Sequence, residues 1–528
     1  MKRFAITIIM AAVLLTIAAA VNFTPLKKLN YAAQIIEGYY VDTVNSGEVV
    51  ESGIIAMLKE LDPHSTYSNA KETQALTEPL QGNFSGVGIQ FNMLTDTLYV
   101  IQTVAGGPSE KVGIVPGDRI IYAQDTLIAG VKMPTDRVMK LLRGPKGSVA
   151  RVRVLRKGSP ELIDFNIVRD NIPIYSVDAA YMADPETGYI RISRFAESTA
   201  KEVKEAMKKL KKQGMKNLIV DLEDNGGGYL NAATDMADMF LKKGDLVVYT
   251  KGDKARPSQY ITSSDGKYTD GRLVVMVNQY SASASEIFAG AMQDQDRGAI
   301  VGRRTFGKGL VQRPFPFPDG SMIRLTIARY FTPSGRCIQK PYTKGDSESY
   351  DLDILDRYKH GEFSNADSIH LPDSLRYYTL RNMRPVYGGG GIMPDRFVPI
   401  DTTEYSEYWR DLVAKGALNR VVNNYIDEHR KELKNEYRKE DAFVDNFTVS
   451  PELIESLKAA GEKEGVKFNA EQFAVSEPAI LRSLKALIGR DLFEQSTYFK
   501  IANEGNPIYR EALNIISKPD EYNKLLDK

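Results

Sequence analysis

The strongest constraint on the fold is an alternation of apolar and amphipathic segments between residues 175 and 335. Short apolar runs, typical of buried strands, lie at residues 189–192, 217–222 and 273–277. Segments with the apolar spacing of helices follow them, at residues 199–212, 232–241 and 285–293. Strands that alternate with helices in this way predict an α/β core.

At 528 residues, the chain is long enough for several domains. Residues 26–81 have helical spacing, whereas residues 82–172 contain short β-type runs separated by glycine-rich turns, which predicts a small β-rich module. The α/β core extends over residues 173–400 and includes a polar, irregular excursion near 341–372. Residues 401–528 are rich in Lys, Glu, Leu and Tyr and predict a helical C-terminal domain.

The N-terminal sequence predicts the cellular compartment in which the protein acts. Lys2 and Arg3 precede an apolar run at residues 4–21. Residues 1–25 therefore read either as a cleaved signal peptide or as an uncleaved signal-anchor, because a run of about 18 residues just reaches the length of a membrane span. Both outcomes place the rest of the chain outside the cytoplasm, in the periplasm or cell envelope, either secreted or anchored to the membrane by the apolar segment.

The composition excludes several classes of function. Lysine and arginine total 69 and aspartate and glutamate 68, so the formal net charge is +1. Such a chain lacks the global positive charge of a nucleic-acid-binding protein, and no nucleic-acid partner is expected. Cys337 is the single cysteine, which excludes an intramolecular disulfide and a multi-cysteine metal site. No metal site is expected from the four histidines, which are far apart: His64, His360, His370 and His429.

The segment with the most chemical content has the sequence SASASE at residues 281–286, followed by TFGKG at 305–309. A serine where a strand leads into a helix can point into a cleft, and the free N–H groups of the helix start suit an oxyanion. On these residues alone, alternatives stay open. A serine there is also a common helix N-cap. Gly-Lys-Gly suggests a phosphate loop, although neither the GxxxxGK[ST] pattern nor a GxSxG motif is present.

Residues 281–312 closely resemble the carboxy-terminal processing proteases, also called tail-specific proteases, a serine peptidase family with a PDZ domain. The signature of that family is SASASE followed by a TFGKGxVQ-like segment, which stands here at 305–312. Further matching segments occur in the family's order: LDPHS at 61–65, GVGI at 86–89, DLEDNGGG at 221–228 and TPSGR at 332–336. The resemblance covers about residues 30–400.

The resemblance implies the catalytic residues. Ser283 is the nucleophile, Lys308 is the general base, and Gln312 helps to orient the lysine. A serine hydroxyl is a poor nucleophile until a base takes its proton. A lysine serves as that base only when neutral, a state that burial among apolar groups favours. Phe306 and Val311 are candidates for the apolar wall around Lys308.

The resemblance also implies an oxyanion hole, formed in the family by a backbone N–H of the glycine-rich loop and that of the residue after the nucleophile. These positions are Gly227 or Gly228, together with Ala284. The loop follows the strand at 217–222, so its N–H groups lie at the carboxyl end of a strand, where ligands often bind. Gly226 stands where the family usually has proline, so we expect a more flexible loop and a hole that is not preformed.

Residues 82–172 resemble a PDZ domain. The GVGI segment, made of Gly86, Val87, Gly88 and Ile89, is similar to the loop whose N–H groups hold the C-terminal carboxylate of a peptide. The peptide then adds as a strand to the edge of the sheet. Protein and peptide substrates would bind here through their C-terminal tails, which supplies binding energy away from the cleaved bond.

Together these features predict an extracytoplasmic serine endopeptidase that cleaves protein substrates near their C-termini and needs no cofactor. The implied fold is multidomain α/β: a core similar to the crotonase/Clp-protease superfamily, an inserted β-rich PDZ domain, and helical N- and C-terminal parts. The C-terminal helices are candidates for a homodimer contact. Two alternatives remain: a catalytically inert PDZ scaffold at the cell envelope, and an acyl-thioester enzyme on the same core, which the secretory signal disfavours.

Overall fold

A computed structural model describes residues 24–94 and 96–527. Nearly all of the predicted signal segment, residues 1–23, lies outside the described residues. The described chain forms two compact units, the first made of residues 24–73, 312–326 and 342–351, the second of residues 74–311, 327–341 and 352–527. Within this part of the chain, no helix has both the length and the apolar character needed to span a membrane.

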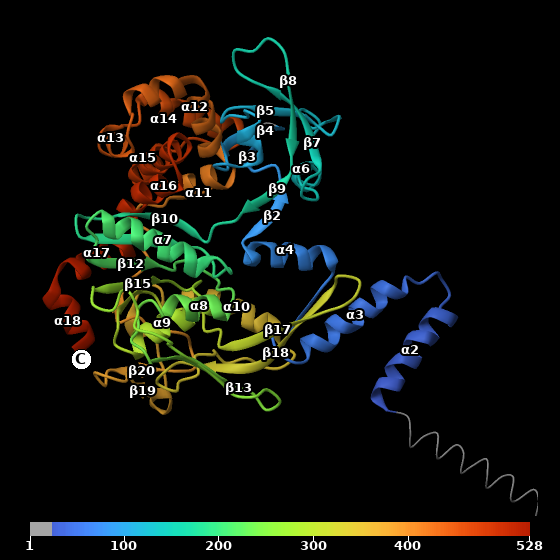
Figure 1. The fold of residues 1–528 in the computed structure, drawn as a ribbon, viewed down its shortest axis with the longest axis vertical. Coiled ribbons are helices and arrows are strands. Elements are labelled where there is room, and N and C mark those ends of the chain that lie inside the picture. Colours follow the sequence, from blue (N-terminus) through green and yellow to red (C-terminus); the bar gives the residue numbers. More distant parts are fainter. Residues whose placement is uncertain (1–23, 95, 528) are drawn as a thin grey trace, which may run out of the picture. The chain divides into compact units, whose positions relative to one another are not determined.

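The first unit contains two helices, α2 (Pro25–Tyr39) and α3 (Ser46–Lys59), and a short strand, β1 (Thr66–Ser68) (Figure 1). β1 pairs antiparallel with the start of β18 (Met322–Phe331), and β17 (Leu310–Pro316) also pairs with β18. The chain passes from the first unit into the second at three places: within α4 (Ala70–Gln81), within β18, and between residues 351 and 352.

The second unit is built on a six-stranded sheet in the order β10-β11-β12-β15-β16-β21. β10 is antiparallel to β11, and the other neighbours are parallel. The strands are β10 (Val177–Met182), β11 (Thr187–Ile192), β12 (Asn217–Asp221), β15 (Leu273–Val277), β16 (Ala299–Gly302) and β21 (Arg396–Phe397). Parallel strands of this kind need helices over both faces, which explains the unbroken apolar run of β15.

Helices cover both faces of this sheet (Figure 1). One face packs against α7 (Thr199–Lys212), α8 (Leu230–Ala237) and α9 (Ala284–Asp294). The other face packs against α17 (Pro507–Ser517) and α18 (Pro519–Asp527). The predicted alternation therefore gives a helix–sheet–helix core.

Smaller elements surround the core. β13 (Leu246–Lys251) pairs with β14 (Ser258–Ile261) and with residues 329–331 of β18, and β19 (Arg376–Tyr378) pairs with β20 (Pro385–Tyr387). Two short 3-10 turns lie at Ala366–Ser368 and Asp373–Leu375.

The prediction that the segment near 341–372 is irregular is wrong in part, because this segment contains the helix α10 (Ser347–Lys359). Its Arg357 is buried, ion-paired with Glu362 at 3.1 Å, and donates to the carbonyl oxygens of Arg304 and Thr305. Contacts far along the chain therefore stabilise a helix whose polar sequence gave little sign of it.

The β-rich segment forms a sheet in the order β3-β4-β5-β7-β8, with β6 beside β5. Its strands are β3 (Ile89–Leu94), β4 (Thr97–Thr103), β5 (Arg119–Ala123), β6 (Thr126–Leu127), β7 (Val149–Leu155) and β8 (Ile163–Val168). A ribbon of β2 (Asn83–Gly86) and β9 (Asp170–Pro173) joins it to the rest of the unit, and two helices complete it, α5 (Pro108–Lys111) and α6 (Thr135–Leu142). This module has a hydrophobic core of its own.

Residues 407–502 form six helices around a separate core. They are α11 (Glu407–Ala414), α12 (Ala417–Glu436), α13 (Glu440–Asn446), α14 (Pro451–Lys463), α15 (Ala470–Leu492) and α16 (Gln495–Ala502). A 3-10 turn at Asn503–Gly505 leads from them into α17.

Candidate active site

Ser283 lies in the turn between the end of β15 and the start of α9. Its backbone has φ 57° and ψ −114°, a region that residues with a side chain rarely occupy. Such a conformation costs on the order of 1–3 kcal/mol and persists only where the surroundings hold it in place. The contacts around this turn therefore show how Ser283 is positioned.

The two flanking serines bind the turn to the glycine-rich loop. The hydroxyl of Ser281 donates to the carbonyl oxygen of Leu222 at 2.7 Å, and the hydroxyl of Ser285 donates to that of Asn225 at 2.8 Å. Ser281 and Ser285 are fully buried, whereas Ser283 is partly exposed. Of the three serines, Ser283 is thus the one that a substrate could reach.

The side chain of Glu286 links the backbone N–H groups of Ser283 and Lys308. Its Oε2 accepts hydrogen bonds from the backbone N–H of Ser283 and of Lys308, each at 2.8 Å. The two backbone nitrogens therefore lie within 5.6 Å of each other, twice that hydrogen-bond distance. Its Oε1 accepts from the Thr305 hydroxyl at 2.5 Å and from the Gly307 N–H at 2.7 Å. One buried carboxylate thus fixes both segments of the motif.

Tyr330, on β18, links the backbone carbonyl groups of the same two residues through its hydroxyl. Its hydroxyl lies 3.1 Å from the carbonyl oxygen of Ser283 and contacts that of Lys308. The tyrosine is almost completely buried, so this contact is shielded from water. Ser283 and Lys308 are therefore held to each other through their N–H groups by Glu286 and through their carbonyl groups by Tyr330.

The protonation of Glu286 depends on its surroundings. Burial raises the pKa of Glu286 to about 7, while the hydrogen bonds that it accepts act in the opposite direction. Because the folded-state pKa lies above the ordinary value of 4.5, this group's contribution to stability is full below pH 4.5 and is lost as the pH rises through about 7.

We expect Glu286→Gln to destabilise the fold by about 2–5 kcal/mol, because an amide nitrogen would face two buried donors. Peptide cleavage per folded molecule should fall about 100-fold, the loss that a displacement near 1 Å can cause. Urea unfolding between pH 4 and 8 and steady-state cleavage measure both effects, and the stability of the variant should lack the pH dependence described above.

Glu202→Gln is the matched control for this prediction. The Glu202 carboxylate also accepts four hydrogen bonds, from the N–H groups of Ser176 and Val177 and the hydroxyls of Ser176 and Ser198, at the start of α7. The Glu202→Gln variant should be less stable than the wild type but should keep the same rate of cleavage per folded molecule. Equal loss of cleavage in both variants would mean that Glu286 has no special link to the site.

The glycine-rich loop packs directly on the Ser283 turn. A Cβ on Gly227 would lie 2.7 Å from the carbonyl oxygen of Ala282 and 2.9 Å from the nitrogen of Ala284, and Gly227 has φ +98°. The N–H of Gly227 donates to the side chain of Asn225 at 2.9 Å. Among the described residues, the N–H groups of Gly228 and Ala284 donate to no other atom. The expectation that the hole is not preformed stays a prediction.

Two neighbouring glycines give a contrast in mutational effect. Gly227→Ala should destabilise the fold by more than about 2 kcal/mol and reduce cleavage at least 100-fold, because its Cβ meets backbone atoms that cannot move freely. Gly226→Ala has open space around the new Cβ and should be neutral or stabilise by up to about 1 kcal/mol. Thermal unfolding and cleavage assays compare the pair, and similar losses in both would contradict this account of the loop.

Gln312 belongs to the first unit, where its side-chain amide donates to the Thr326 hydroxyl at 3.2 Å. Thr326 in turn donates to Asp62 at 2.9 Å, and the backbone N–H of Thr326 donates to the Ser65 hydroxyl at 3.1 Å. The LDPHS segment thus orders the surroundings of Gln312. The predicted role of Gln312 toward Lys308 stays a prediction.

The apolar wall predicted around Lys308 stays a prediction. Val311 packs against the core of the second unit. The centroid of the Phe306 ring lies 4.3 Å from the ammonium of Lys340.

Sequence reasoning missed two residues of this site. Glu286 could have been found, because Ser283 and Glu286 have the Ser-x-x-Glu spacing of a capping box. Tyr330 has no local signal, since it lies on a distant strand and meets Ser283 only in the folded chain.

The predicted carboxylate loop of the β-rich module leads from β2 into β3. Gly88 has φ +75°, and a Cβ there would lie 3.0 Å from Ile172 and 3.1 Å from Pro108, so the backbone needs glycine. Gly86 ends β2, Val87 is buried, and Ile89 begins β3. β3 is the terminal strand of its sheet, so among the described residues its outer edge has no strand partner. An extended peptide could pair with that edge.

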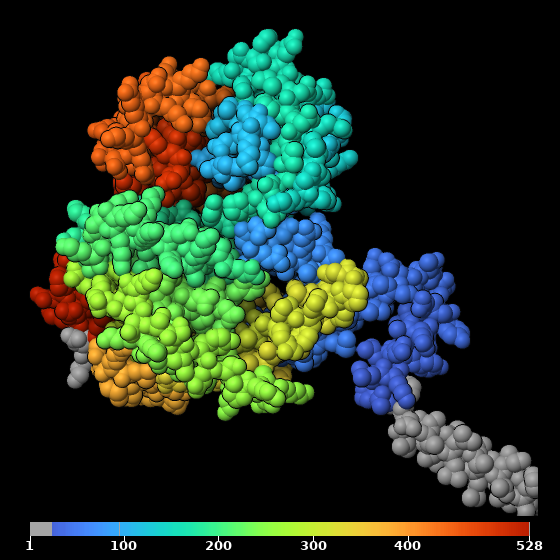
Figure 2. Space-filling model, viewed as in Figure 1, coloured from blue at the N-terminus to red at the C-terminus, as the bar shows by residue number. Residues whose placement is uncertain are grey.

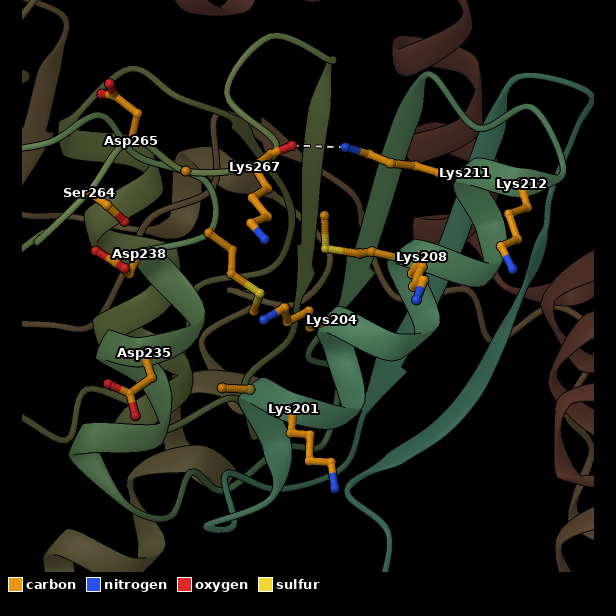
Figure 3. Close-up of a pocket in the computed structure, with 14 residues that line it drawn as sticks. Lys201, Lys204, Lys208, Lys211, Lys212, Asp235, Asp238, Ser264, Asp265 and Lys267 are labelled. Atoms are coloured by element: carbon orange, nitrogen blue, oxygen red, sulfur yellow. Dashed lines mark hydrogen bonds between the residues drawn. The ribbon is translucent and has the colours of Figure 1, made fainter.

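A groove of about 920 Å³ lies away from these residues, between α7 and α8. Figure 3 shows the lysines of α7 along one wall and Asp235 and Asp238 along the other. α7 buries Val203, Met207 and Leu210, so its lysines fall on the remaining, solvated faces. None of the predicted site residues lines this groove.

Three family profiles match segments of this chain. The profile of peptidase family S41 matches residues 186–349, that of a PDZ domain matches residues 85–167, and that of a family of unknown function (DUF8443) matches residues 408–494. A probable CtpA-like serine protease of Staphylococcus epidermidis is 36% identical over 315 residues, which cover 59% of this chain and 63% of that relative.

A second relative matches over a longer span. The probable CtpA-like serine protease of Staphylococcus aureus MRSA252 is 34% identical over 424 residues, 79% of each chain. Among solved structures, the photosystem II D1 C-terminal processing protease is 28% identical, with 58% of this chain and 83% of that chain covered and a TM-score of 0.32. The chain therefore belongs to the carboxy-terminal processing serine proteases of peptidase family S41, which carry a PDZ domain.

Proposed function

We propose that this chain is an extracytoplasmic serine endopeptidase that cleaves protein substrates near their C-termini, with Ser283 as nucleophile and Lys308 as base. The observation that carries the proposal is the double connection of these residues through Glu286 and Tyr330. Fixed geometry between a nucleophile and its base is what this chemistry requires, because a small displacement removes much of the rate.

The proposed reaction follows the logic of serine proteases with lysine in place of histidine. Neutral Lys308 takes the proton of the Ser283 hydroxyl as its oxygen attacks the peptide carbonyl. The N–H groups of Ala284 and of Gly227 or Gly228 stabilise the resulting oxyanion. Lys308 then gives the proton to the departing amine, and water hydrolyses the acyl-enzyme by the same steps. Gln312 orients Lys308.

The PDZ domain supplies substrate selection in this proposal. The backbone of Gly86, Val87, Gly88 and Ile89 would hold the terminal carboxylate, and the tail would pair with the edge of β3. The domain boundaries follow the sequence: a helical part at 26–81, the PDZ domain at 82–172, a protease core at 173–400 similar to the crotonase/Clp superfamily, and a helical domain at 401–528.

The proposed setting is the periplasm or cell envelope. Residues 1–25 would act as a signal peptide or as a signal-anchor that holds the protein at the membrane. A homodimer through the C-terminal helices stays a prediction.

Labelling with a fluorophosphonate tests the proposed chemistry directly. We expect mass spectrometry to find one adduct on Ser283 of the full chain, no adduct in Ser283→Ala, and at least about 100-fold slower labelling in Lys308→Ala. Absence of labelling together with binding of a C-terminal peptide would support an inert PDZ scaffold instead. Binding of a coenzyme A analogue at the core would support the acyl-thioester enzyme.

A further inference from the structure

The PDZ sheet is covered on its outer face as well as its inner face. On β4, Leu98 and Val100 pack in the core of the PDZ domain. Tyr99 alternates with them and points to the opposite face, yet only 3% of its surface is exposed. A bulge at this part of β4 places Gln102 on the same outer face as Tyr99. Another part of the chain therefore covers this face.

Gln102 identifies the end of α15 as part of that cover. Its side-chain amide donates to the carbonyl oxygens of Arg490 at 2.8 Å and Phe493 at 3.3 Å. The last carbonyls of a helix have no partner within the helix and must bind something else when they are buried. A PDZ side chain thus completes the C-terminus of a helix in the C-terminal domain.

Asp427, on α12, is the second contact. Its carboxylate accepts from Arg119, at the start of β5, at 2.7 Å, and its backbone carbonyl accepts from the Lys157 ammonium at 2.9 Å. The Arg119 and Asp427 side chains are only 31% and 16% exposed, so water screens this ion pair less than a surface pair. Two basic residues of the PDZ domain therefore meet one acidic residue of the helical domain.

The same run of helices contacts the core sheet at its other end. In α16, the Ser496 hydroxyl accepts from the N–H of Ala180 at 3.2 Å. Just before α17, the side chain of Asn506 donates to Glu223 at 2.7 Å. Glu223 is buried directly before the loop that leads to Gly227. The C-terminal helices therefore touch both the PDZ domain and the base of the glycine-rich loop.

We propose that the helices α12–α17 act as a bracket that fixes the PDZ domain relative to the glycine-rich loop. This assigns a role to residues 408–494, which match a family of unknown function. The bracket holds β4 and β5 and leaves the outer edge of β3, where a peptide would pair, to its ligand. The proposal rests on contacts between domains and not on the peptidase activity.

Charge reversal in the full chain tests the bracket by hydrogen–deuterium exchange. Arg119→Glu and Asp427→Arg should each speed exchange in residues 97–103 and 486–494 by roughly tenfold, as expected from the loss of one charge-assisted hydrogen bond. The double variant with both charges exchanged should return to within about threefold of the wild type, because the pair forms again in reverse.

Arg151→Glu is the matched control, since Arg151 pairs with Asp125 on the exposed surface of the same PDZ domain. It should leave exchange in residues 486–494 unchanged. Unchanged exchange there in both single variants would overturn the proposal. So would faster exchange in Arg119→Glu that spreads through the PDZ strands, including residues 149–155, without reaching 486–494, since that pattern reports PDZ unfolding.

Discussion

Replacement of Ser283 by alanine is expected to reduce cleavage of a peptide with an apolar C-terminus by at least about 10⁴-fold, as the loss of a serine nucleophile does in other serine hydrolases. The fold should persist, because the backbone bonds of residue 283 to Glu286 and Tyr330 do not involve its hydroxyl. Steady-state cleavage and thermal unfolding of the full chain measure the two quantities separately.

Ser281→Ala and Ser285→Ala are the controls for that experiment. Ser285→Ala removes the bond to Asn225 and should cost about 1 kcal/mol of stability. Ser281→Ala removes the bond to Leu222 and the bond that the hydroxyl accepts from the Asn278 N–H, and should cost about 1–3 kcal/mol. Their cleavage should stay within about tenfold of the wild type. If Ser283→Ala kept more than a tenth of the activity, or if Ser281→Ala lost as much as it, the assignment of the nucleophile would be wrong.

Replacement of Lys308 is the second large effect. Lys308→Arg should lose at least about 10³-fold in cleavage, because a guanidinium stays protonated and cannot accept the serine proton. Lys308→Ala should lose a similar amount but recover part of its activity when a small alkylamine is added, since the amine can take the place of the missing base. Both variants keep the backbone bonds of residue 308 to Glu286 and Tyr330.

Lys201→Arg, on the wall of the groove between α7 and α8, controls for the exchange of cations in general and should leave cleavage unchanged. Activity of Lys308→Arg near the wild-type level would show that Lys308 contributes charge and not base catalysis. Failure of the amine to restore Lys308→Ala, in a protein that unfolds like the wild type, would place the base elsewhere.

The regular core was predictable because local pattern is sufficient for it. β15 occupies the expected residues 273–277, since a run of five apolar residues rich in valine favours a strand that is buried on both faces. α7 matches its expected range because Val203, Met207 and Leu210 repeat at helical spacing. α10 was missed because Arg357 holds it through partners that lie far away in the sequence.

The sequence could propose which residues form the site, but not the contacts that hold them in place. Resemblance to a family supplied Ser283 and Lys308, and a capping box could have supplied Glu286. Tyr330 lies 47 positions from Ser283, and Asn506 lies 283 positions from Glu223, so neither contact leaves a trace in local sequence. Such contacts arise only when the sheet has formed and distant segments meet.

The shared oxygen of Glu286 sets the length of the chain between the two halves of the motif. The backbone N–H groups of Ser283 and Lys308 donate to the same oxygen of Glu286, and the chain between them forms α9 and β16. One added or deleted residue would rotate α9 or shift the register of β16 and separate the two halves. In a library of short in-frame insertions across the whole chain, residues 284–307 should therefore appear as a continuous gap among the active clones.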